Sequence, residues 1–190
     1  MIKDSLISNL RYAVIDVETT GLASSTDRII EIAVAYNNNG KILNTYSELI
    51  NPGISIPWVI TDITGITDVK LRKAPQFKEI ADGFVDLLKD RVLIAHNSFF
   101  DINFISAELK RCHQKNLSNS VLCTLRMSRH LCSNLENHKL GTLADFFGIK
   151  IKKQHRALGD ALATAEIFLK LSDIAEKKGI TKLSQLMKIA

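Results

Sequence analysis

The chain has 190 residues, 46% of them hydrophobic, so it can bury one substantial core and we expect a single domain over residues 1–190. Its formal net charge of +5 and its pI of about 9.1 favour association with a polyanion such as nucleic acid. No run of eighteen apolar residues occurs, and the 3 cysteines form neither a Cys-x-x-Cys pair nor a disulfide framework, which indicates a cytoplasmic protein that does not bind membranes.

The first predicted element is a buried strand at residues 11–17, where apolar and β-branched residues dominate. Because side chains alternate between the two faces of a strand, Asp16 and Glu18 share one face. Their Cα atoms are expected to lie roughly 6.5 Å apart, close enough for both carboxylates to bind one cation. Thr19-Thr20-Gly21 then ends the strand.

Two further strands are predicted at residues 29–36 and 41–50. They are joined by Asn37-Asn38-Asn39-Gly40, whose residue types tolerate the positive φ of a hairpin. The first three strands would therefore be antiparallel. Asn51-Pro52-Gly53 ends the third strand, and a long connection through Thr64-Gly65-Ile66-Thr67 leads to the first helix.

Helical periodicity dominates the next part of the chain. Apolar residues recur at helical spacing over residues 77–88, just after Pro75 and Gln76. A short strand at residues 92–95 follows, and its end delivers His96 and Asn97. The next helix carries apolar residues at helical spacing up to position 109, which places Asp101 at or near its start.

Thr124 and Thr142 are predicted N-caps of two short helices, the second of which ends at Gly148. The last long helix is predicted from about Leu158 to about Lys177. Asp160 lies near its start on the apolar face, and a buried carboxylate is costly unless it has a partner such as a metal ion.

Basic residues gather before this last helix. Lys150, Lys152, Lys153 and Arg156 flank His155. If that histidine is catalytic, phosphates would approach here, and the basic side chains could neutralise them. Strands followed by alternating helices and strands predict an α/β or α+β layered domain with helices on both faces of the sheet.

These residues resemble, in order and local spacing, the motifs of the DEDDh 3′-to-5′ exonucleases. That family includes the epsilon proofreading subunit, the exonuclease domain of Gram-positive replicative polymerases and oligoribonuclease. The stretches that carry the resemblance are Asp16-Val17-Glu18-Thr19-Thr20-Gly21, His96-Asn97 with Asp101, His155-x-Ala157-x-x-Asp160, Asn51-Pro52-Gly53, Thr64-Gly65-Ile66-Thr67 and Asn137-His138-Lys139-Leu140. The match covers residues 11 to about 172 and leaves residues 178–190 as a short C-terminal tail.

The resemblance implies a ribonuclease-H-like fold with a mixed sheet and a catalytic site that holds two divalent cations, Mg²⁺ or Mn²⁺. Asp16 would bridge the two ions, Glu18 and Asp160 would complete the site that holds the attacking water, and Asp101 would support the second ion. His155 would be the general base, because an unperturbed histidine is mostly neutral at pH 7. Carboxylate oxygens are the ligands that these ions prefer.

By the same resemblance, substrate contacts fall to Thr19, Thr20, Thr64, Ile66 and Phe100. His96 is a structural residue or a hydrogen-bonding residue on the substrate side. One departure is visible, since Cys123 precedes Thr124 where relatives often have aspartate. This affects only local substrate contacts.

The expected function is a metal-dependent exonuclease that removes nucleoside 5′-monophosphates from the 3′ end of single-stranded or frayed DNA in proofreading or repair. An exoribonuclease of the oligoribonuclease or RNA-trimming type uses the same residues and is the alternative within enzymes. A non-catalytic nucleic-acid-binding or polymerase-accessory module is the alternative of another class. The expected partners are single-stranded nucleic acid and a DNA polymerase subunit, and homodimerisation stays open.

Overall fold

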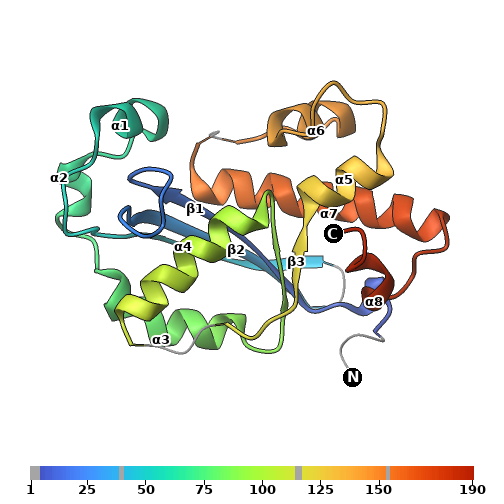
Figure 1. Ribbon diagram of the computed structural model, residues 1–190, viewed down its shortest axis with the longest axis horizontal. Helices are drawn as coiled ribbons and strands as arrows, with labels where there is room; N and C mark the ends of the chain where they lie inside the picture. The colour runs from blue at the N-terminus through green and yellow to red at the C-terminus, as the bar shows by residue number, and fades with distance from the viewer. Residues whose placement is uncertain (1–4, 39–40, 114–116, 153–154) are drawn as a thin grey trace.

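The computed structural model describes residues 5–38, 41–113, 117–152 and 155–190. A five-stranded sheet of order β3-β2-β1-β4-β5 forms its centre (Figure 1). The strands are β1 (Tyr12–Thr19), β2 (Ile29–Asn38), β3 (Lys41–Leu49), β4 (Val92–Ala95) and β5 (Val121–Cys123). The first three pair antiparallel, whereas β4 pairs parallel with both β1 and β5, so the predicted mixed sheet is confirmed. The tip of the predicted hairpin, residues 39–40, lies outside the described residues.

The helices are α1 (Trp58–Thr64), α2 (Asp68–Leu71), α3 (Phe77–Leu88), α4 (Ser98–Arg111), α5 (Thr124–Leu131), α6 (Leu140–Phe147), α7 (Ala157–Lys177) and α8 (Leu183–Leu186), with a 3-10 turn η2 (Ile7–Asn9). The periodic helices α3, α4 and α7 fall where the sequence predicts them. The long connection after β3 contains the short helices α1 and α2. Among the described residues, no helix combines the length and apolar character that a membrane crossing requires.

Two apolar cores lie on opposite faces of the sheet. On one face, Ala13, Ile15 and Val17 of β1 pack with α3 and α4. On the other face, Tyr12 and Val14 pack with α5, α6, α7 and α8. The prediction of helices on both faces is therefore confirmed.

The two predicted N-caps are wrong. Cys123 and Lys139 occupy the N-cap positions of α5 and α6. The Thr124 hydroxyl instead donates to the backbone oxygen of Ala95 at 3.4 Å, and the Thr142 hydroxyl donates to Oδ1 of Asn137 at 2.7 Å. Both hydroxyls bond to groups outside the helix that they were expected to cap. The predicted end of α6 at Gly148 is confirmed by its left-handed φ of 69°.

The C-terminal segment packs against the start of the chain. Leu183 and Leu186 of α8 are buried in the core beside α7. The backbone N–H of Ile7 donates to the oxygen of Thr181 at 2.9 Å, and that of Leu183 donates to Ser5 at 3.0 Å. The two ends of the described chain therefore lie side by side (Figure 1).

Candidate functional site

Four predicted acidic residues converge where β1 meets the starts of two helices. Ligand oxygens of Asp16, Glu18 and Asp160 all lie within 4.8 Å of one another. Asp101, in the first turn of α4, accepts a hydrogen bond from the backbone N–H of Val17 at 3.2 Å, between the two acids of β1. Three elements that are distant in sequence thus meet at one acidic cluster, which we define as Asp16, Glu18, Asp101 and Asp160.

Small residues position the start of α7 against the sheet. Ala157 and Ala161 of α7 pack in one buried cluster with Ala33 of β2. Ala33 is the residue paired with Asp16 in the antiparallel register of β1 and β2. Because short side chains at a contact allow close approach, the first turn of α7 brings Asp160 to the strand that carries the other acids.

A fifth acid, Glu31, fixes this same turn and was missed by the sequence analysis. Glu31 is 1% exposed and pairs directly with Glu18 in the β1–β2 register. Its carboxylate accepts from Nε of Arg156 at 3.0 Å and from the backbone N–H of Ala157 at 3.0 Å. Glu31 therefore satisfies a free N–H at the start of α7. A charged residue within the apolar run Ile29-Ile30-Glu31-Ile32-Ala33 was the available signal.

The ion pair corrects one expectation about the basic segment. Arg156 was grouped with residues that would meet phosphates, but its guanidinium is bound to Glu31, and this hydrogen bond raises its pKa. Lys150 and Lys152 are exposed, and Lys153 lies outside the described residues.

Burial and mutual repulsion raise the pKa of every acid in the cluster. The pKa of Asp16 is raised well above its usual range by burial and by the neighbouring carboxylates. Burial, reinforced by Asp160, raises the pKa of Glu18 to about 7, and burial raises that of Asp101 to about 8. The pKa of Asp160 is also raised by burial, and the backbone N–H of His155 partly opposes the shift. The positive charge near the cluster is therefore too small to offset the burial and mutual repulsion of its carboxylates.

A divalent cation fits this arrangement. Oδ1 of Asp160 is buried and has no hydrogen-bond partner among the described residues. The converging groups are carboxylate oxygens, which suit Mg²⁺ or Mn²⁺ and not a soft metal. A cation would supply both the missing partner of Asp160 and the positive charge that the raised pKa values show to be lacking.

His155 lies at the edge of the cluster, in the turn that precedes α7. Its backbone N–H donates to Oδ2 of Asp160 at 3.1 Å. Its φ is 59°, in the left-handed region that histidine enters more readily than most residues. The residue is exposed, and its imidazole acts electrostatically on Asp160. The structure thus brings the predicted base to the predicted acids.

His96 occupies a different environment. Its Nδ1 lies 3.0 Å from the Thr124 hydroxyl, and burial lowers its pKa to about 4. The imidazole is therefore neutral near pH 7 and links the end of β4 to the start of α5. This geometry favours the structural interpretation of His96.

The predicted substrate threonines use their hydroxyls to build turns. Thr19 donates to the oxygen of Gly21 at 2.6 Å, and Thr20 accepts from the N–H of Arg28 at 3.0 Å. Thr64 donates to Ile60 at 2.7 Å and accepts from Ile66 at 3.1 Å. These bonds shape the loops and leave any direct substrate contact as a prediction.

Of the two apolar residues predicted to contact substrate, Ile66 needs revision and Phe100 stays a prediction. Ile66 is 1% exposed and buried in a small cluster with Ile30, which leaves no side-chain surface for the predicted contact. Phe100 is half-buried, with its ring centroid 4.8 Å from that of Phe104, whereas its neighbour Phe99 is 77% exposed. The sequence held a signal for the exposure of Phe99, because it lies four residues before the polar Asn103 and so shares a helix face with it.

Buried charges also fix the loop after β1 to α4. Glu108 accepts from Nε of Arg28 at 2.9 Å and lies 3.2 Å from Nη1 of Arg111. Nη2 of Arg111 donates to the backbone oxygen of Ser24 at 2.7 Å. Within the loop, a Cβ at Gly21 would meet the Asp27 carboxylate at 2.5 Å and would displace it from its hydrogen bond with the N–H of Ala23. The helix that carries Asp101 and the loop that follows Glu18 are therefore held together.

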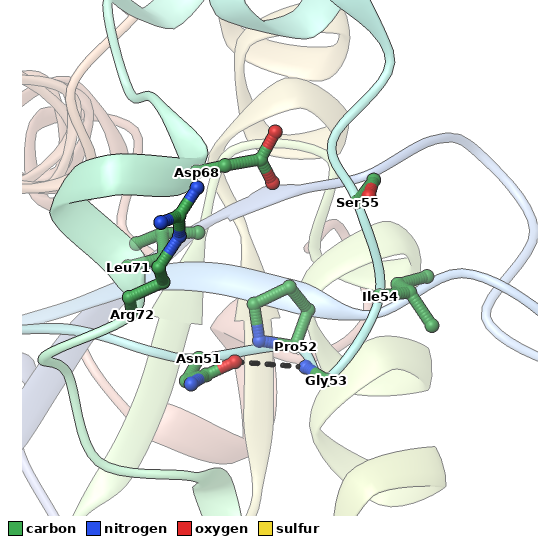
Figure 2. A pocket seen from close by; sticks show the side chains of 8 residues that line it. All are labelled: Asn51, Pro52, Gly53, Ile54, Ser55, Asp68, Leu71 and Arg72. Atoms are coloured by element: carbon green, nitrogen blue, oxygen red, sulfur yellow. Dashed lines mark hydrogen bonds between the residues drawn. The ribbon is translucent and has the colours of Figure 1, made fainter.

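A separate hollow of about 480 Å³ lies beside the turn after β3. Figure 2 shows Asn51 folding back so that its Oδ1 accepts from the N–H of Gly53 at 3.0 Å. On the other side, Asp68 of α2 accepts from the N–H of Ile56 at 3.1 Å. The hollow is lined by neither the acids of the cluster nor His155.

The chain is similar in sequence to an exonuclease family and to PolC-type DNA polymerases. The model of the family RNase_T, described as exonuclease, matches residues 13–168. The PolC-type DNA polymerase III of Caldanaerobacter subterraneus subsp. tengcongensis is 42% identical over 175 residues, which is 92% of this chain and 12% of that polymerase. The PolC-type enzyme of Streptococcus suis is 36% identical over 184 residues, or 96% of this chain and 13% of that enzyme. The chain thus spans a small part of the length of these curated relatives.

Solved structures share the fold. Exonuclease X in complex with 5′ overhanging duplex DNA superimposes with a TM-score of 0.73 and 25% sequence identity, covering 94% of this chain and 98% of that chain. E. coli exonuclease I in complex with a dT13 oligonucleotide has a TM-score of 0.80 and 18% identity, covering 90% of this chain and 42% of that chain. The predicted ribonuclease-H-like fold is confirmed.

Proposed function

Because this chain belongs to the RNase_T exonuclease family, as its resemblance to the DEDDh exonucleases predicted, we propose that it is a metal-dependent 3′-to-5′ exonuclease acting on single-stranded or frayed DNA. The single observation that carries the proposal is the acidic cluster. Ligand oxygens of three acids lie within 4.8 Å of one another, and Oδ1 of Asp160 is buried without a partner among the described residues. Two divalent cations, Mg²⁺ or Mn²⁺, are the cofactors that this cluster suits.

Each acid has a distinct part in holding the cofactors. Asp16 would be a ligand of both cations, Glu18 and Asp160 would complete one site, and Asp101 would support the other. Bound there, the cations would activate the attacking water and stabilise charge on the leaving oxygen. Asp101 also fixes the end of β1 through the N–H of Val17.

His155 is the proposed general base. As the water oxygen attacks phosphorus, an imidazole nitrogen of His155 accepts the water proton. The bond between phosphorus and the 3′ oxygen of the preceding nucleotide then breaks, and the leaving 3′ oxygen takes up a proton from solvent water. The products are a nucleoside 5′-monophosphate and a strand that is one nucleotide shorter, with a new 3′-hydroxyl. The backbone bond from His155 to Asp160 keeps the base beside the acids during this step.

DNA is favoured over RNA because the relatives with 36 to 42% identity are DNA polymerases. The same similarity to DNA polymerases supports a role in proofreading, in association with a polymerase. RNA is the alternative substrate, because the acidic cluster and His155 could act on the phosphodiester backbone of either DNA or RNA. The proposal does not require a homodimer.

The test uses a single-stranded oligonucleotide labelled at its 5′ end, with Mg²⁺ or with a chelator. A ladder of labelled products, each one nucleotide shorter, is expected with Mg²⁺ alone. Cleavage of a circular single strand would overturn the exonuclease assignment, and faster cleavage of a matched RNA strand would assign the RNA alternative. If none of these substrates is cleaved, the alternative of a non-catalytic nucleic-acid-binding module would be favoured.

A matched pair of variants links the activity to the cluster. Asp160→Asn removes a cluster carboxylate, and Asp173→Asn makes the same change at an exposed position of the same helix. Titration calorimetry with Mn²⁺ should show loss of metal binding only for Asp160→Asn. Equal metal binding by both variants would contradict the cofactor site independently of turnover.

A further inference from the structure

A groove of about 410 Å³ runs between the first turn of α4 and the helix α5. Its floor includes Ile102 and Leu125, and its rim carries Phe99, Arg126 and Arg129. None of the residues that line it is acidic. This groove was not part of the site that the sequence predicted, and none of the four acids lines it.

The groove has unpaired positive charge. Arg126 and Arg129 are both exposed and lie three residues apart, so they project from the same side of α5. Over residues 5–38, 41–113, 117–152 and 155–190, neither forms an ion pair with a carboxylate. Arginine presents a planar fork of donors that matches phosphate oxygens, so two such side chains suit two phosphates of a strand.

An exposed aromatic ring lies on the opposite rim. Phe99 is 77% exposed, although it belongs to a helix whose other phenylalanine side chains are half-buried or buried. An exposed ring at the edge of a positively charged groove is a platform on which a base can stack. A surface that binds single-stranded nucleic acid combines basic side chains that contact phosphates with an aromatic ring on which a base stacks, and this groove has both.

The groove adjoins the acidic cluster. Asn97, which lines it, directly follows His96 and precedes the helical turn that carries Asp101. Phe99 and Asp101 both belong to that first turn, where Phe99 is exposed on one side and Asp101 is buried on another, and α4 begins without a side-chain cap. The N-terminal end of the α4 dipole favours negative charge near this turn. A nucleic-acid strand whose 3′ end lies at the acidic cluster can therefore continue across the first turn of α4 into the groove.

We propose that the groove binds the part of the substrate strand on the 5′ side of its terminal nucleotide, with Arg126 and Arg129 on phosphates and Phe99 under a base. The inference rests on the proposed exonuclease function, which supplies the end of the strand. The recognised chemistry is a phosphodiester backbone with stackable bases, shared by DNA and RNA.

The first experiment measures binding by fluorescence anisotropy, with Ca²⁺ in place of Mg²⁺, for oligonucleotides of two and six nucleotides as DNA and as RNA. Wild-type protein should bind the longer strand more tightly. The double variant Arg126→Ala/Arg129→Ala should lose most of this gain. Its slope of log affinity against log salt should become shallower by about 1.4, because each phosphate contact contributes about 0.7 on a single strand.

The control is Lys170→Ala/Lys177→Ala, which removes the same charge from exposed positions of α7. An affinity loss no greater in the arginine variant than in this control would overturn the proposal and is the result expected if the groove docks a protein. Equal losses for DNA and RNA would identify shared backbone binding. A loss confined to one of them would identify that strand as the ligand.

Phe99→Ala should weaken binding of the six-nucleotide strand by about 5- to 150-fold, the range for losing one stacked base, and Phe99→Trp should restore it. No loss in Phe99→Ala would overturn the stacking assignment. Hydrolysis of the 4-nitrophenyl ester of thymidine 5′-monophosphate by wild-type protein tests the proposed function separately. If the protein is inactive but still binds the longer oligonucleotide more tightly, the proposed exonuclease function is wrong and the proposed strand binding by the groove stands.

Discussion

Glu31 of β2 and Arg156 of the turn before α7 form an ion pair across 125 residues of sequence, with Nη2 of Arg156 2.6 Å from Oε1 of Glu31. Glu31 lies beside Glu18 in the sheet, and the charge of Arg156 opposes the rise in the pKa of Glu18. The pair therefore joins the strand next to β1 to the helix that carries Asp160. It also places one positive charge beside a group of acids that repel one another.

Removing Arg156 should destabilise the protein. Arg156→Ala leaves the buried Glu31 carboxylate without its charged partner. We expect the free energy of unfolding to fall by about 2 to 3 kcal/mol, less than for a fully buried pair because the Arg156 side chain is 34% exposed. Thermal denaturation should show a melting temperature lower by about 4 to 12 °C.

Two further variants separate charge from geometry at this pair. Arg156→Lys keeps the charge but not the two-pronged contact, so it should recover only part of the stability. Glu31→Gln combined with Arg156→Ala removes the unpaired buried charge and should be more stable than Arg156→Ala alone. A double variant that is less stable than both single variants would contradict the assigned pairing.

Asp16→Asn should abolish turnover while the folded protein survives. The amide keeps the volume of the side chain but removes one of the repelling charges, so the metal-free protein should melt at a higher temperature near pH 8. The checks are single-turnover hydrolysis at saturating Mg²⁺ and differential scanning calorimetry with a chelator. Wild-type turnover in this variant would exclude Asp16 as a metal ligand.

The stability of the metal-free protein should fall as pH rises from about 4 to about 8. Folding raises the pKa of Glu18 to about 7 and that of Asp101 to about 8, from about 4 in the unfolded chain. The folded state therefore binds more protons than the unfolded state across this window, and raising the pH favours unfolding.

Metal should reverse this trend, because it binds the deprotonated carboxylates. At about 100 times its dissociation constant, a cation contributes about 2.7 kcal/mol. Urea denaturation at several pH values, with a chelator or with Mn²⁺, measures both slopes. A metal-free protein that is more stable at pH 8 than at pH 5 would argue against the raised pKa values.

Replacing His155 should reduce turnover by about 10²- to 10⁴-fold with little change in metal binding, since a general base contributes about that factor. Asparagine is the suitable substitute, because it tolerates the left-handed backbone at a φ of 59° better than alanine does. Single-turnover hydrolysis and Mn²⁺ titration calorimetry of both proteins check this. Wild-type turnover in His155→Asn would exclude His155 as the general base.

Local patterns were sufficient to predict the longer elements. The strands β1 to β3 and the helices α3, α4 and α7 have runs of residues long enough to show a period, and β4 is a short run of apolar residues between two of these helices. The strand β5 and the helices α1 and α2 span too few residues for this. The N-cap predictions at Thr124 and Thr142 were wrong because their hydroxyls bond to partners that no local pattern reveals.

The candidate site divides in the same way. The acidic cluster and His155 were predicted because each lies in a recognisable short motif. Glu31 was missed because its role depends on Arg156, which lies in a different part of the chain. Phe99 was missed because exposure depends on which face of α4 packs against the sheet.

The acidic cluster draws on segments that are far apart along the chain, which matters for when activity can appear. The Val17–Asp101 contact spans 84 residues and the Glu31–Arg156 contact spans 125. During synthesis, the antiparallel hairpins of β1, β2 and β3 can form early, since their contacts are local, whereas pairings over such distances form late. A nascent chain that has not yet produced α7 lacks Asp160 and His155. The acidic cluster should therefore be complete only after α7 has been synthesised and has packed on the sheet, so metal binding should arise late in the folding of these residues.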